Sequence, residues 1–118
     1  MYTETYNGKY IICIGNTQDQ NQELVSKTKR MNQNALWFHV GNGLSSPHGV
    51  LFDKVKTAAT KYDKDAIIRT AMLVKQHSRE SIKMLHAVTI EYIPIKFVET
   101  TDTPGRVHLK KTPNKIVI

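Results

Sequence analysis

Two short apolar runs joined by a brief link constrain the fold of this chain more than any other feature. Residues 36–40 read Leu-Trp-Phe-His-Val, residues 48–52 read His-Gly-Val-Leu-Phe, and the link 41–47 contains Gly and Pro. Aromatic and β-branched runs bounded by such residues are typical of β-strands. Parallel strands need a crossover of roughly a dozen residues, so this short link predicts an antiparallel pair.

Further strands are predicted on both sides of this pair. Residues 10–14 form an apolar, β-branched run between two glycines, and residues 87–93 alternate between apolar and polar side chains. Residues 106–110 and 115–118 flank a Pro-Asn turn and predict a C-terminal β-hairpin. Residues 1–7 are polar and are expected to be flexible.

Two helices are predicted between these strands. The first follows Asn16-Thr17, which can cap a helix, and carries its acidic residues early and its basic residues late. The second runs from Asp63 to Arg79, with apolar residues on one face and basic residues on the other. The sum is an α+β fold: a mainly antiparallel sheet of about five to six strands with two helices packed on one face.

Composition indicates one ordinary folded domain over residues 1–118. The chain is 40% hydrophobic and 23% charged, and no apolar run approaches the ~20 residues of a membrane-spanning helix. Its first residues do not resemble a secretory signal. The single cysteine, Cys13, excludes an internal disulfide and a multi-cysteine zinc site, and its apolar strand predicts a buried, unreactive thiol. We therefore expect a cytoplasmic protein.

Net charge is the unusual property of this composition. Seventeen Lys and Arg residues against ten Asp and Glu residues give +7. A positive field attracts polyanions, nucleic acid first and anionic membrane second. The alternative is that this charge serves solubility alone, since small soluble domains commonly carry a net charge of about 2–8 in magnitude.

Basic residues gather in three stretches, of which the last is the best candidate for binding nucleic acid. Strand alternation directs Arg106, His108 and Lys110 to the same side, and Lys111 and Lys115 follow closely. Such a stripe can lie along a phosphate backbone, although a solvated hairpin is the alternative. The rival surfaces are the basic side of the second helix, with Lys64, Lys75 and Arg79, and the end of the first helix, with Lys27, Lys29 and Arg30.

His39 and His48 lie on the two adjacent predicted strands and can face each other. We favour a structural role in ordering the Trp37 strand; contact with nucleic acid is the second interpretation, and both residues stay candidates for it. A metal site or a hydrolase pairing His48 with Ser45 or Ser46 is the third. No Asp, Glu or Cys lies near them in sequence, so no metal or cofactor is expected. As the sole tryptophan, Trp37 is expected in the core rather than on a base-stacking platform.

Four segments, in order across residues 8–118, carry a family pattern. They are residues 15–24 (a glycine, a polar spacer, Asn, an acidic residue and Leu), residues 36–40 (Leu-Trp-Phe-His-Val), residues 44–48 (Leu-Ser-Ser-Pro-His), and residues 104–107 (Pro-Gly-Arg-Val) with 116–118. Together they resemble the NFACT-R family. This is the small RNA-binding module of ribosome-quality-control proteins that add amino acids to stalled nascent chains.

The resemblance and the charge together predict a non-enzymatic RNA-binding module. The resemblance implies tRNA or rRNA in ribosome-associated quality control, whereas the charge implies only a polyanion. DNA and the ribosome are further candidate partners. The alternative is a protein-interaction module that docks on a ribosomal or other assembly, and a small hydrolase or metal enzyme is the third hypothesis.

Overall fold

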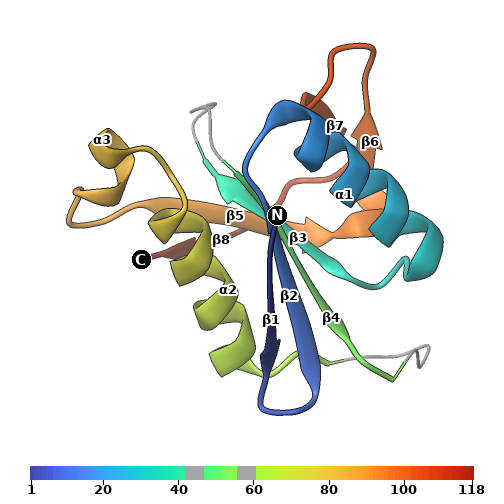
Figure 1. Cartoon of the computed structure of the whole chain (residues 1–118), viewed down its shortest axis with the longest axis horizontal. Coiled ribbons are helices and arrows are strands. Elements are labelled where there is room, and N and C mark those ends of the chain that lie inside the picture. Colours follow the sequence, from blue (N-terminus) through green and yellow to red (C-terminus); the bar gives the residue numbers. More distant parts are fainter. Residues whose placement is uncertain (42–46, 56–60) are drawn as a thin grey trace.

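A computed structural model describes residues 1–41, 47–55 and 61–118 and confirms the α+β class (Figure 1). The large sheet is antiparallel and has the strand order β1-β2-β4-β3-β5-β8. Its strands are β1 (Tyr2–Tyr6), β2 (Tyr10–Gly15), β3 (Leu36–Val40), β4 (His48–Asp53), β5 (Thr89–Pro94) and β8 (Asn114–Val117). A second, two-stranded sheet joins β6 (Val98–Thr100) to β7 (Val107–Leu109). The helices are α1 (Gln18–Met31), α2 (Lys64–Gln76), the short α3 (Glu80–Lys83) and the 3-10 turn η1 (Ile95–Phe97).

The predicted antiparallel pair is confirmed at the centre of the large sheet. β3 pairs with β4 in a register that sets Trp37 opposite Val50. On its other side β3 pairs with β5, where Trp37 lies opposite Ile93. Trp37 is fully buried, as expected of the sole tryptophan.

The helices lie on opposite faces of the large sheet, so the prediction that both cover one face is wrong (Figure 1). Ile12, Phe38 and Leu51 point to the α2 face and join its core cluster. Cys13 and Trp37, their strand neighbours, join a second cluster with α1 and the β6–β7 sheet. Residues 10–14 and 36–40 are apolar at successive positions, and strands of that kind need cover on both faces.

α1 begins as the sequence predicts, whereas α2 ends early. The hydroxyl of Thr17 accepts a hydrogen bond from the Gln20 amide at 3.1 Å, which caps the start of α1. α2 stops at Gln76 instead of reaching Arg79. The buried Ser78 hydroxyl donates to the Val74 carbonyl at 2.8 Å, satisfying an acceptor at the helix end. Arg79 instead caps α3.

Residues 1–7 are not a flexible segment, because Tyr2–Tyr6 forms β1 against β2. Glu4 on β1 accepts two hydrogen bonds from the Arg69 guanidinium of α2, at 2.7 and 2.8 Å. Tyr2 and Tyr6 pack against the core cluster on the α2 face. The polar strand is therefore held by one bidentate ion pair and two tyrosine rings.

The predicted C-terminal hairpin is also wrong. β7 pairs with β6 in the small sheet, and β8 pairs with β5 at the edge of the large sheet. Val107 and Leu109 of β7 pack in the cluster on the α1 side, whereas Ile116 of β8 packs on the α2 side. The apolar residues of the two strands are buried in different core clusters, so the strands lie apart although they are neighbours in sequence.

In the parts of the chain that the structure describes, no helix is long and apolar enough to cross a membrane.

Candidate nucleic-acid interface

The β6–β7 sheet presents the basic alternation that the sequence predicts. Arg106, His108 and Lys110 are exposed, whereas Val107 and Leu109 between them pack toward Trp37 and α1. A strand alternates its side chains between two faces, so the packing of the apolar pair fixes the outward direction of the basic residues. β7 thus carries a cationic row even though its partner strand is β6.

An aromatic ring with two lysines lies at the base of this sheet. The ammonium of Lys111 lies 4.7 Å from the ring centroid of Phe97, and that of Lys96 lies 5.3 Å from it. Cation–π contacts of this kind at exposed sites are worth about 0.5–1 kcal/mol. Sequence reasoning missed Lys96 and Phe97; the available signal was a basic residue next to an aromatic one, two residues after Pro94.

Two further contacts set the charge of this surface. The Lys110 ammonium lies 3.0 Å from the Glu99 carboxylate, and both side chains are about half exposed. Hydrogen bonding and charge from Lys110 lower the pKa of Glu99. From α1, Lys29 donates to the Val98 carbonyl at 2.6 Å, which adds a cation beside β6. We call the whole set the β6–β7 basic face: Lys29, Lys96, Arg106, His108, Lys110 and Lys111.

The other predicted basic residues lie elsewhere. Lys115 is on β8 of the large sheet, opposite Glu91 of β5. Lys64 and Lys75 lie in the first and last turns of α2, about 16 Å apart along the axis. Lys75 donates to the main-chain oxygen of Ile118 at 3.0 Å. Because the helix ends before Arg79, these residues do not form the continuous basic side that was predicted.

The two histidines surround Trp37 on the α1 face of the large sheet. The His39 ring stacks on the indole at a centroid distance of 4.6 Å, and the His48 ring meets it edge to face at 4.9 Å. His39 Nε2 also lies 2.8 Å from a carboxylate oxygen of Glu91. The expectation that no acidic residue lies near this pair is wrong, because β5 brings Glu91 directly opposite His39.

Burial disfavours the charged form of both histidines. Burial, with a smaller contribution from His39, lowers the pKa of His48 to about 3. Burial also lowers the pKa of His39, and Glu91 opposes that shift. His48 is 5% exposed, so it does not offer a surface to nucleic acid. Their packing around Trp37 and the burial of His48 support the structural interpretation of the pair.

The metal-site and hydrolase alternatives concern the same two histidines. Among the described residues, no group of three His, Cys, Asp or Glu side chains can hold a metal ion. Ser45 and Ser46, the hypothetical nucleophiles, lie outside the described residues.

Within the described chain, Trp37 Nε1 and His48 Nδ1 are buried without a hydrogen-bond partner. Cys13 is half-buried rather than fully buried, and burial raises the pKa of its thiol.

Comparison with known proteins identifies a fold but no family. No family model and no curated protein matches the chain. A solved structure, the C-terminal part of the fibronectin/fibrinogen-binding protein from Streptococcus suis, is similar with a TM-score of 0.79 and 21% identity. The match covers 98% of this chain and 43% of the solved chain, so this chain spans less than half of it. At this identity the likeness concerns the fold alone.

Proposed function

We propose that this protein is a non-enzymatic RNA-binding module and that its β6–β7 basic face contacts the RNA. One observation carries the proposal: the outward row Arg106, His108 and Lys110 lies along β7, next to the η1 turn that holds Phe97 with its two lysines. Exposed Lys and Arg side chains neutralise phosphates, and this gives affinity without base specificity. An aromatic ring beside such a row can also stack on an unpaired base.

The cellular setting is the finer part of the proposal. The sequence resemblance to the NFACT-R family supports tRNA or rRNA as the ligand, in ribosome-associated quality control in the cytoplasm. The net charge of +7 supports a polyanionic partner of any kind. The alternative, docking on a protein assembly through apolar area, differs in its response to salt, because salt screens charges but leaves apolar burial intact.

A salt titration of RNA binding separates these functions. A fluorescein-labelled single-stranded RNA of 20 nucleotides is titrated with the wild type and with the triple variant Arg106→Ala, Lys110→Ala and Lys111→Ala, at several salt concentrations. Each lost phosphate contact should flatten the slope of log K against log salt by about 0.7 on single strands, so three contacts give roughly 2. The triple variant should bind all RNA sequences more weakly, and by a similar factor.

A matched control removes the same charge elsewhere. Lys9, Lys54 and Lys61 are exposed and form no ion pair in the described chain, so their triple change to Ala should leave the salt slope near the wild-type value. Equal losses in both variants would mean that net charge, and not this face, determines binding. Absence of RNA binding by the wild type at ~150 mM salt would reject the RNA function in favour of protein docking.

A further inference from the structure

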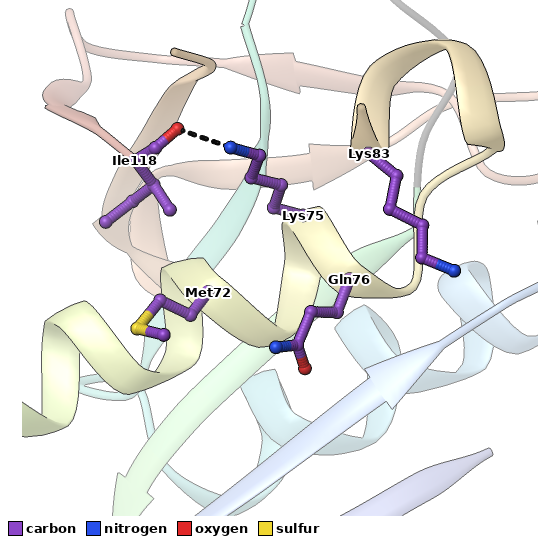
Figure 2. A pocket seen from close by; sticks show the side chains of 5 residues that line it. All are labelled: Met72, Lys75, Gln76, Lys83 and Ile118. Carbon is purple, nitrogen blue, oxygen red and sulfur yellow. Dashed lines mark hydrogen bonds between the residues drawn. The ribbon is translucent and has the colours of Figure 1, made fainter. Parts of the chain in front are cut away.

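A hollow of about 230 Å³ lies where α2, α3 and the end of β8 meet (Figure 2). Its lining residues are Met72, Lys75, Gln76, Lys83 and Ile118. Met72 and Ile118 supply apolar surface, and the long aliphatic stems of the lysines border it. The hollow belongs to the α2 side of the large sheet, whereas the β6–β7 basic face belongs to the α1 side.

The charge around this hollow is positive. The ammonium of Lys83 lies 3.3 Å from the exposed carboxylate of Glu80. Lys75 uses a main-chain oxygen and forms no ion pair with a carboxylate in the described part of the chain. Arg79, between α2 and α3, is exposed and likewise has no ion pair among the described residues. An anionic partner would therefore meet one exposed arginine without an ion pair in the described chain, and two lysines whose present partners are an exposed carboxylate and a main-chain oxygen.

Apolar side chains continue beyond the hollow. Met84 and Leu85, which directly follow Lys83, are 79% and 48% exposed. Met72 itself is 38% exposed. Methionine adapts its shape easily and is common at binding surfaces. The combination favours a partner that brings apolar side chains together with negative charge.

The main chain of β8 is open on its outer edge. Val88 and Ile118 exchange both of their amide–carbonyl hydrogen bonds, at 2.8 and 2.9 Å. Facing residues in an antiparallel ladder alternate between bonded and non-bonded pairs, so the amides of Val117 and Lys115 point away from β5. β8 is the last strand of the sheet, so in the described chain no strand pairs with this edge.

We propose that an extended acidic segment of another protein adds to the outer edge of β8 and places an apolar side chain in the hollow. The open ladder selects an extended chain, the lysines select acidic residues, and Met72 with Ile118 selects an apolar anchor. Side chains of the added strand that neighbour Ile116 and Ile118 point to the α2 face, where the hollow lies. RNA matches the lysines alone, because it has no amide ladder for β8.

The test uses a fluorescein-labelled 12-residue peptide in which every second residue is in turn Val or Glu, with Thr between them, so that both apolar and acidic side chains face α2. We expect it to bind the wild type, and we expect the double variant Lys75→Gln with Lys83→Gln, and separately Met72→Glu, to weaken binding at least tenfold. Lys54→Gln with Lys61→Gln removes the same charge from exposed positions and should leave affinity unchanged. Circular dichroism checks that every variant is folded.

Amide hydrogen exchange reports the added strand directly. Exchange at Lys115 and Val117 should slow when the peptide is bound, whereas Ile116 and Ile118 already bond to β5 and should change little. A peptide with proline at alternate positions lacks the required amides and should bind at least tenfold more weakly.

Any one of several results would overturn the proposal. They are absence of peptide binding, equal loss in the control variant, unchanged exchange at Lys115 and Val117 on binding, and undiminished binding of the proline peptide. Loss of RNA binding in the Lys75–Lys83 variant, with the β6–β7 triple variant unaffected, would make the hollow a nucleic-acid site and would also overturn it.

Discussion

His39 and Glu91 face each other across β3 and β5, with His39 Nε2 2.8 Å from Glu91 Oε1. The bond ties these two neighbouring strands together beside Trp37, on which the His39 ring stacks. Burial lowers the pKa of His39, and hydrogen bonding and charge from Glu91 hold it up.

Glu91→Gln should lower the pKa of His39 further. The amide keeps a hydrogen-bonding atom in place but removes the negative charge that favours the imidazolium. Titration of the His39 ring resonances by NMR measures the shift, with His108, exposed on β7 of the small sheet, as the internal control. An unchanged His39 pKa would show that the carboxylate contributes no charge at this site.

Stability should fall as the pH drops below about 6.5, because of His48. Burial lowers the pKa of His48 in the folded state to about 3, whereas an unfolded histidine titrates near 6.5. The unfolded state then binds the extra proton, so the contribution is complete above pH 6.5 and is lost progressively toward pH 3. The loss is about 1.4 kcal/mol per pH unit in this window. Urea unfolding at pH 7, 6 and 5 measures it.

His48→Phe provides the matched comparison. It removes the titrating group and the unpartnered ring nitrogen while keeping an aromatic ring next to Trp37. The variant should lose less stability between pH 7 and pH 5 than the wild type does. An identical pH dependence in the two proteins would assign the acid sensitivity to other groups.

Glu4→Gln should cost about 1 kcal/mol of unfolding free energy and loosen β1. The substitution weakens the bidentate ion pair with Arg69. This pair is partly exposed to solvent, which screens the charges, so its contribution to the free energy of unfolding is small. Arg69 lowers the pKa of Glu4 to about 2, so this contribution is present above about pH 4.5 and is lost as the pH falls toward 2. Denaturant unfolding and faster amide exchange in β1 measure the effect. Thr3→Ser, on the same strand, should be nearly neutral.

Gly49→Ala should destabilise the fold by about 1–3 kcal/mol through overpacking. A Cβ atom at Gly49 would lie 2.8 Å from Val74 Cγ2 and 3.1 Å from Ile14 Cδ1, between α2 and the sheet. Gly8→Asn is the control, because Gly8 has open space and a φ of +64° that asparagine tolerates. Chemical denaturation of both variants tests the difference, and equal stabilities would show that α2 shifts without cost.

Thr17→Ala should cost about 1 kcal/mol, because it removes the side-chain cap of α1. Thr17→Ser retains a hydroxyl and should recover most of that loss. Thermal unfolding of the pair isolates the cap from other effects of substitution. Equal stability of the Ala and Ser variants would contradict a capping role.

The elements that sequence predicts well are those with local signals. The strand 36–40 is bounded by turn residues and is continuously apolar, and Thr17 precedes a helix with its charges in the favourable order. Local signals do not predict that β7 pairs with β6 and β8 with β5. A Pro-Asn turn between them indicates a hairpin, but the apolar residues of each strand find different core clusters. Which cluster accepts a strand depends on the assembled sheet.

The site shows the same division. Alternation along residues 106–110 predicts the outward direction of Arg106 and Lys110, and the structure bears this out. The partners of these residues come from other segments, as Glu99 does for Lys110. Glu91 reaches His39 from 52 positions away along the chain, so nothing near His39 in sequence indicates an acidic neighbour.

The position of β3 between β4 and β5 sets the order in which this protein can assemble. β4 lies within a few residues of β3 along the chain, but β5 follows only after α2 and α3. A growing chain that has reached the end of α2 therefore carries β3 with one edge unpaired. Such long-range pairings make folding slow, and an unpaired apolar edge invites association with other chains. Once β5 has been synthesised and pairs with β3, both edges of β3 are covered. The nascent chain therefore needs protection most before that point.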